Sequence, residues 1–183
     1  MGVSEILKDT ETRMKKSIES ANNDFGSLRT GRATPQMLDG IKVDYFGQAM
    51  SIKELGTIQI PDPRVLMIEP WDRTALQAIE KAIMNSQLGL AANNDGVRIR
   101  LNIPVLTEER RKEFVKQLKQ KAEAGRVSLR NIRRDANDTL KKDDEVTEDD
   151  AKRGEKEVQK LLEKYAGELD SLEKAKEAEL LES

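Results

Sequence analysis

The segment of this 183-residue chain closest to a known chemical motif is a loop that resembles a phosphate-binding loop. Residues 26–33 read GSLRTGRA, against a GxxxxGK[ST] pattern in which the lysine reaches phosphates and the hydroxyl residue binds Mg²⁺. Arg32 takes the place of the lysine, and Ala33 takes the place of the hydroxyl residue. The segment also follows a predicted helix, whereas the motif links a strand to a helix. These departures argue against nucleotide binding.

The chain lacks two residue types on which most enzyme sites depend. It contains no histidine and no cysteine, which removes the usual general base, the thiolate nucleophile and the commonest zinc ligands. The acidic run at residues 148–150 could hold a divalent cation, but it is more typical of a helix start, where the dipole favours carboxylates. The sequence therefore predicts a protein that is not an enzyme and that uses neither a cofactor nor a metal ion.

The strongest chemical signal is a row of basic side chains on a helix predicted over residues 107–142. Apolar residues three and four apart define one side of this helix. They are Phe114, Leu118, Ala122, Gly125, Leu129, Ile132, Ala136 and Leu140. A second side, which we call the basic face, carries Lys112, Lys116, Lys119, Arg126, Arg130, Arg133, Arg134 and Lys141. Glu123 is the one acidic residue in that band.

The basic face predicts a partner made of many anions. Like charges one turn apart repel each other, so such a face mildly destabilises the free protein. Arginine suits phosphate through its bidentate fork, and the six aromatic residues are too few and too scattered for base stacking. Contacts to the backbone of a folded RNA fit this pattern best. One alternative stays open, a helical adaptor or chaperone whose basic face binds an acidic protein.

Charge is distributed unevenly along the chain. Residues 105–142 hold twelve basic and six acidic residues, whereas residues 143–183 hold seven basic and fifteen acidic ones, although the net charge of the whole chain is −2.

No stretch approaches the ~18 apolar residues of a membrane span, and residues 1–20 lack the apolar core of a signal peptide. We therefore expect a cytoplasmic protein with no membrane partner, and we also expect it to be a monomer.

Three long predicted helices position the basic face. Apolar spacing predicts a first helix over residues 3–29, a second over 107–142 and a third from Thr147 to about residue 181. In residues 31–104, β-branched residues alternate with polar ones, which predicts strands, and a short helix is expected over 74–88. The predicted fold class is α+β. A long three-helix bundle (residues 1–30 and 105–183) is interrupted by a small inserted β/α/β domain (residues 31–104).

The chain is expected to cross between these two domains twice, at about residues 30–35 and 104–106. Pro35 disfavours helical backbone at Thr34 and so ends the first helix. Two short connections restrict relative motion mainly to swinging and twisting. The predicted hinge residues are Thr30, Gly31, Arg32, Pro104, Val105 and Leu106.

Three multi-residue motifs resemble the bacterial ribosome recycling factors. They are RTGRA at residues 29–33, LTEERRK at 106–112 and RNIRRDAND at 130–138. Two weaker matches, EKAIM at 80–84 and LGL at 88–90, lie in the inserted domain. The similarity covers essentially the whole chain, in order and without a large gap.

This resemblance implies an L-shaped molecule with a two-stranded hinge that acts on the post-termination ribosome. It implies a joint action with elongation factor G, whose GTP hydrolysis drives the subunits apart, and binding of large-subunit ribosomal RNA by the helical bundle. The inserted domain would face elongation factor G. Together with the basic face, the motifs give the RNA-binding candidates Arg29, Arg32, Arg110, Arg111, Lys112, Lys116, Arg126, Arg130, Arg133 and Arg134. Arg111 projects near the apolar side of its helix, so part of its role is expected to be structural.

Overall fold

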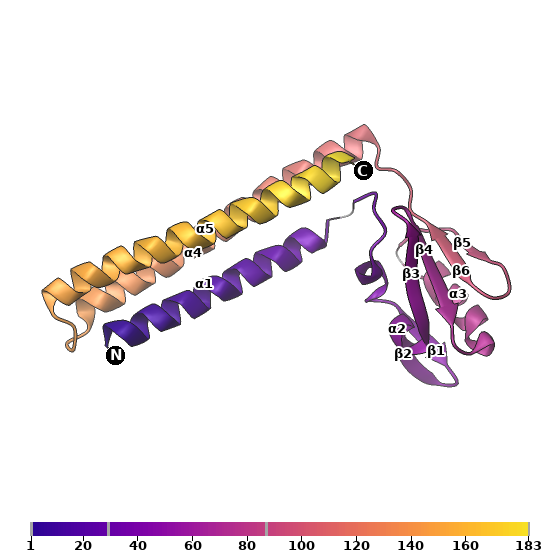
Figure 1. Ribbon diagram of the computed structural model, residues 1–183, viewed down its shortest axis with the longest axis horizontal. Helices are drawn as coiled ribbons and strands as arrows, with labels where there is room; N and C mark the ends of the chain where they lie inside the picture. Colours follow the sequence, from indigo (N-terminus) through magenta and orange to yellow (C-terminus); the bar gives the residue numbers. More distant parts are fainter. Residues whose placement is uncertain (1, 29, 87, 183) are drawn as a thin grey trace. The chain divides into compact units, whose positions relative to one another are not determined.

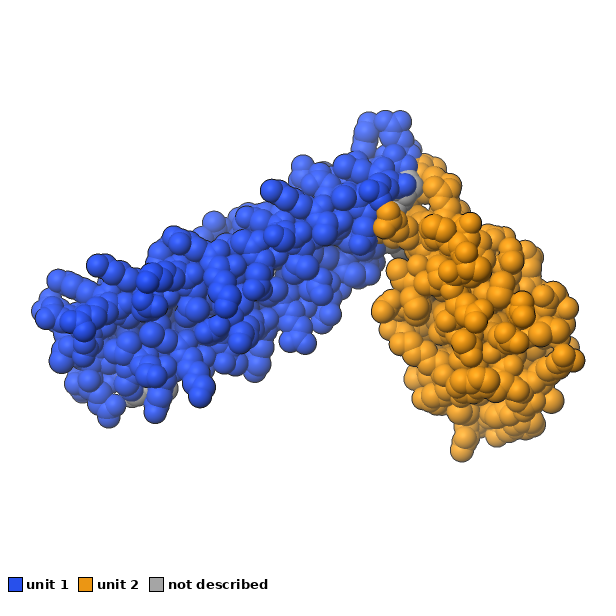
Figure 2. Space-filling model, in the orientation of Figure 1, with its two compact units in different colours: residues 1–29, 108–182 blue, residues 30–107, 183 orange. Residues whose placement is uncertain are grey.

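The computed structural model describes residues 2–28, 30–86 and 88–182, and the chain divides into two compact units. One unit is formed by residues 1–29 and 108–182, and the other by residues 30–107 (Figure 2). The first consists of long helices and the second contains a small sheet. The prediction of an α+β fold with long helices and a small sheet domain is thereby confirmed.

Three helices build the first unit: α1 (Val3–Gly26), α4 (Glu108–Lys142) and α5 (Glu148–Glu182). They lie side by side with α4 antiparallel to the other two, and the loop from α4 to α5 lies at the same end of the bundle as the start of α1 (Figure 1). The backbone N–H of Asp150 donates to Oγ1 of Thr147 at 3.2 Å, which confirms Thr147 as the cap of the third helix. The first helix ends at Gly26, earlier than the predicted residue 29.

The apolar spacing of each helix forms the buried core of the bundle. Leu118 and Leu129 of α4 and Leu169 of α5 are almost fully buried. Two glycines let the helices approach closely, because a Cβ on Gly154 would lie 2.9 Å from both methyl carbons of Leu140. A Cβ on Gly125 would lie 3.1 Å from a methyl carbon of Leu169. Because the two glycines have no side chains, Leu140 and Leu169 pack closely against them, and this close packing fixes the register of the long helices.

The second unit contains a four-stranded antiparallel sheet in the order β3-β4-β6-β5. Its strands are β3 (Gly56–Asp62), β4 (Val65–Pro70), β5 (Ala92–Asn94) and β6 (Ile99–Asn102). A separate antiparallel hairpin pairs β1 (Lys42–Tyr45) with β2 (Gln48–Ser51). The helical elements are α3 (Leu76–Met84), the single turn α2 (Ile52–Leu55), and the 3₁₀ turns η1 (Pro35–Leu38) and η2 (Arg73–Ala75).

Every second residue of the central strands β4 and β6 is buried, and these residues fill the core of this unit. Leu66 and Ile68 of β4 lie opposite Leu101 and Ile99 of β6, and all four are fully buried. Helix α3 adds buried apolar side chains to the same core. The hairpin turn Phe46–Gly47 has positive φ at both residues, 49° and 81°, which is the backbone of a two-residue turn whose twist matches its strands.

Alternating residues predict strands at residues 41–45, 58–60 and 97–103, where the structure has β1, β3 and β6. Sequence patterns did not predict β2, α2, β4 and β5. Strand β4 lies between β3 and β6 and carries apolar residues at nearly every position. Its sequence therefore shows little alternation between apolar and polar residues. The helix predicted over 74–88 begins at Leu76 and ends at Met84. The hydroxyl of Ser86 donates to the carbonyl oxygen of Ile83, a local bond that competes with continued helix.

Candidate nucleic-acid interface

The predicted RNA-binding residues other than Arg29 and Arg32 lie on α4. Near its start, Arg110 is exposed, whereas Arg111 is half-buried with its Nε atom buried. This agrees with the position of Arg111 near the apolar side of the helix. Arg29 lies outside the described residues. Arg32 is an exposed residue of the second unit, and its backbone N–H donates to Oγ1 of Thr30 at 3.3 Å.

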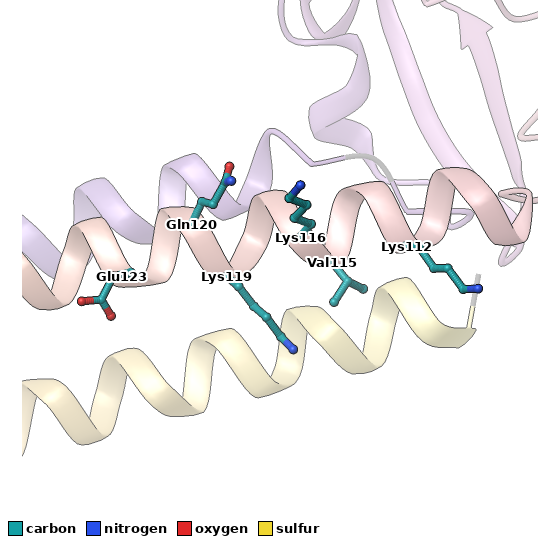
Figure 3. Close-up of a pocket in the computed structure, with 6 residues that line it drawn as sticks. All are labelled: Lys112, Val115, Lys116, Lys119, Gln120 and Glu123. Atoms are coloured by element: carbon teal, nitrogen blue, oxygen red, sulfur yellow. The ribbon is translucent and has the colours of Figure 1, made fainter.

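Three lysines line a shallow groove along the first half of α4. Lys112, Lys116 and Lys119 share it with Val115, Gln120 and Glu123 (Figure 3). Lys112 lies 3.5 Å from Glu108, and both side chains are so exposed that this pair contributes little. Among the residues that the structure describes, Lys116 and Lys119 form no ion pair. This segment therefore presents uncompensated positive charge to solvent.

Arg126 belongs to a cluster of ion pairs that joins α4 to α5. Its Nη1 lies 3.3 Å from Glu123, and its Nη2 lies 3.4 Å from Asp170 and contacts Glu173. Burial by itself lowers the pKa of Arg126, but the surrounding carboxylates, with Glu173 the strongest, raise it overall. Only 31% of the Arg126 side chain is exposed. Its geometry serves the contact between the two helices.

After Arg126, the arginines of the basic face contact fewer carboxylates. Arg130 Nη2 donates to Oε1 of Glu123 at 2.8 Å, and Arg133 donates to the neutral Gln159 at 3.3 Å. Arg134 is exposed and has no ion pair within the described ranges. The hydrogen bond from Arg130 lowers the pKa of Glu123, partial burial opposes this, and Arg126 adds to the lowering. Glu123 therefore stays ionised between its two arginines.

The structure divides the basic face into segments that its sequence did not distinguish. Asp170 and Glu173 of α5 contact Arg126 in the middle of the face. These acids lie 44 and 47 residues from Arg126 along the chain, and pattern analysis of one helix does not see them. The excess of acidic residues after residue 143 was the available signal. Lys119, which was not among the predicted RNA-binding residues, lines the groove of Figure 3.

The predicted hinge residues of the second unit lie outside helices and strands. They are Thr30, Gly31, Arg32, Pro104, Val105 and Leu106. Next to them, the N–H of Ala33 donates to the carbonyl of Pro63 at 2.7 Å, and the N–H of Ile103 donates to the carbonyl of Arg64 at 2.8 Å. Both ends of the inserted segment are thus attached to the turn between β3 and β4.

None of the described helices has the length and apolar composition needed to cross a bilayer. Within the same part of the chain, no group of three or more acidic, histidine or cysteine residues is arranged to hold a metal ion. The exposed lysines of α4 form a cationic surface, and surfaces of this kind attract phosphate groups.

Comparison with known proteins gives matches along nearly the whole chain. A family model described as "Ribosome recycling factor" matches residues 21–181. The ribosome-recycling factor of Carboxydothermus hydrogenoformans is 51% identical over 182 residues, covering 98% of each chain. That of Syntrophomonas wolfei is 51% identical over 183 residues, covering 98% of this chain and 99% of the other.

Two solved structures resemble this one over nearly their full length. A solution structure of a ribosome recycling factor has a TM-score of 0.80 and 40% identity, covering 99% of this chain and 98% of the other. The second is the T. thermophilus ribosome recycling factor, described together with E. coli elongation factor G bound to the E. coli post-termination complex. Its TM-score is 0.67 and its identity 44%, covering 99% of this chain and 100% of the other.

Proposed function

Because this chain belongs to the ribosome recycling factor family, we propose that it acts with elongation factor G and GTP to separate the subunits of post-termination ribosomes. The observation that carries the proposal is the match to ribosome-recycling factors over 98% of the chain. The T. thermophilus relative, described with elongation factor G on a post-termination complex, supports the choice of partner. In this proposal the protein works as a cytoplasmic monomer, and elongation factor G hydrolyses the GTP.

The basic face of α4 is proposed to bind the phosphate backbone of large-subunit ribosomal RNA. Lys116, Lys119 and Arg134 support this role, because they are exposed and form no ion pair among the described residues. Such cations release counterions from RNA when they bind it, which gives a salt-dependent affinity. Arg126, which contacts three carboxylates, contributes less to RNA binding than its sequence position predicts.

Light scattering of post-termination ribosomes tests the proposed reaction directly. The ribosomes are mixed with this protein, elongation factor G and GTP, and the fall in scattering reports separation of the subunits. We expect the fall only when all three are present. No fall, with the protein folded and the elongation factor active on other substrates, would contradict the proposal. Capture of a lysate partner that survives nuclease digestion would instead favour an adaptor that binds an acidic protein.

The Lys116→Ala variant tests the RNA-binding face in the same system. We expect it to weaken ribosome binding a few-fold and to reduce the slope of log affinity against log salt by about 0.7 to 0.9, because one phosphate contact is lost. Lys160→Ala is the matched control, since it removes an exposed lysine of α5 that pairs with Glu157 at 3.2 Å. Equal effects of the two substitutions on affinity and slope would argue against the proposed face.

A further inference from the structure

The middle of the basic face carries more negative than positive charge. Arg126 and Arg130 lie there, and three carboxylates contact them: Glu123 from α4, and Asp170 and Glu173 from α5. The local sum is −1, in contrast to the uncompensated lysines in the first half of the helix. An RNA backbone that follows α4 therefore meets an acidic interruption between two basic segments.

The two arginines of this cluster differ in how firmly they are held. Arg126 contacts two carboxylates of a neighbouring helix as well as Glu123, and Glu173, one of the two, is only 15% exposed. The ion pair with Glu123 is the one that Arg130 forms within the described residues. Half of the Arg130 side chain and 56% of Glu123 are exposed to solvent. Arg130 can therefore exchange its carboxylate for another anion without disturbing the bundle.

A carboxylate and a phosphate present similar acceptor oxygens to a guanidinium group. Both accept short charge-assisted hydrogen bonds, and both accept them in a forked arrangement. Glu123 uses Oε1 for Arg130 and Oε2 for Arg126, so one carboxylate bridges two guanidinium groups. A phosphodiester group placed at the same position would use its two non-bridging oxygens in the same way.

We propose that Glu123 substitutes for a phosphate in the free protein, and that its carboxylate limits how tightly the basic face of α4 holds an RNA backbone. This inference rests on the proposed function, because it assumes that the basic face binds ribosomal RNA. When RNA binds, a phosphate displaces Glu123 from Arg130, and the displaced carboxylate stays beside the phosphate and repels it. Exposed ion pairs are weak, so we expect this limit on the affinity for RNA to be modest.

The Glu123→Gln variant tests this role, because it removes the charge and keeps the shape of the side chain. We expect Glu123→Gln to bind ribosomes about threefold more tightly than the wild type at moderate salt, as the loss of one weak competing pair predicts. The slope of log affinity against log salt should steepen by less than the ~0.7 to 0.9 of a full phosphate contact, because Arg130 contacts the RNA in both proteins and only the opposing charge of Glu123 is removed. The measurement is ribosome binding of a fluorescently labelled protein over a salt series.

Glu157→Gln is the matched control for the change in net charge. Glu157 is 51% exposed and pairs with Lys160 on α5, so the same charge is lost together with one exposed ion pair. It lies seven residues before Lys164, which pairs with Glu11 of α1, and thus on the side of α5 that faces α1. We expect this control to bind as the wild type does.

A double variant assigns the effect to Arg130. In an Arg130→Ala background, Glu123→Gln should gain much less affinity than it gains alone, because the arginine that it would release is absent. Circular dichroism and thermal unfolding verify that each variant keeps the bundle. A gain that persists unchanged in the Arg130→Ala background would overturn the assignment.

The outcomes separate this inference from the proposed function. Salt-dependent binding by the wild type with no gain in Glu123→Gln relative to Glu157→Gln would overturn the role of Glu123 alone. Weaker binding by Glu123→Gln would also overturn it, since the carboxylate would then be positioning Arg130 for RNA. If the wild type itself neither binds ribosomes nor separates their subunits, the proposed function fails and the role of Glu123 fails with it.

Discussion

At the scale of single residues, Tyr165 shows how a polar group is accommodated inside the bundle. This residue of α5 is 2% exposed, and its hydroxyl donates to Oε1 of Glu11 on α1 at 2.8 Å. That hydrogen bond lowers the pKa of Glu11, partial burial opposes the effect, and Lys15 and Lys164 add to the lowering. Burial, together with the Glu11 carboxylate, raises the pKa of Tyr165 to about 12.

The Tyr165→Phe variant is expected to lower the Tm by about 3 °C at pH 7, because a hydrogen bond to an ionised acceptor is lost. The pKa of Glu11 is lowered in the folded state. Ionised Glu11 therefore stabilises the fold at pH values above its ordinary pKa of 4.5, and this stabilisation is lost as the pH falls through the lowered pKa. The difference in Tm between wild type and variant should therefore shrink in acid. Calorimetric scans between neutral and acidic pH measure it.

Ser17→Ala provides the control for this prediction. Ser17 and Ser128 share a hydrogen bond of 2.8 Å between α1 and α4, and neither hydroxyl titrates in this range. Its loss should change the Tm by an amount that is independent of pH. A Tyr165→Phe effect that also stayed constant into acid would contradict the assignment of Glu11 as the ionised acceptor.

At the scale of elements, the long helices of the bundle depend on glycines at their closest contacts. Gly154 and Gly167 both lie within α5. A Cβ at Gly154 would lie 2.9 Å from two methyl carbons of the buried Leu140, whereas a Cβ at Gly167 would have nothing within 4 Å. The two positions have the same helical backbone and differ in packing, so they can be compared directly.

The comparison of Gly154→Ala with Gly167→Ala isolates the cost of that packing. Alanine favours helix over glycine, so Gly167→Ala should stabilise the protein by about 0.5 to 1 kcal/mol. Gly154→Ala makes the same backbone gain but crowds Leu140, so we expect it to be less stable than Gly167→Ala by about 1 kcal/mol or more. Urea unfolding measures both. Equal stabilities would show that α4 and α5 separate at this contact without penalty.

At the scale of the whole molecule, the chain passes between two separate cores. The bundle and the inserted unit each bury their own apolar residues. The chain connects them through residues without helix or strand, and the adjoining Ala33 and Ile103 are attached to the turn between β3 and β4. We propose that these short connections, next to fixed anchor points, act as a hinge between the two units.

The Gly31→Pro variant tests whether that motion matters for recycling. Proline fixes φ at residue 31 and restricts Thr30 before it, so one connection becomes stiffer. We expect ribosome binding through the bundle to change by less than about twofold and the rate of subunit separation to fall by about threefold or more, as for a rate-limiting conformational step. Stopped-flow light scattering gives that rate. Normal separation by a correctly folded variant would remove hinge motion from the mechanism.

Much of the bundle could be predicted from sequence because its information is local. The spacing of Leu118, Ala122 and Leu129 follows the helical period, and a long helix repeats that signal many times. The inserted unit was predicted less well. Strands β2 and β5 have only four and three residues, too few for a clear alternation, and β4 is apolar at nearly every position because strands pair with it on both sides.

The candidate site, too, was predicted only in part from the sequence. The sequence by itself determined that α4 would carry a row of cations beside an apolar seam, because both patterns belong to one helix. It did not determine which of those cations are available. Only the tertiary structure decided that Asp170 and Glu173 contact Arg126 while Lys116 and Lys119 stay open to solvent. The physical reason is that a charge acts through space on whatever the fold brings near it, whereas helical periodicity acts along the chain.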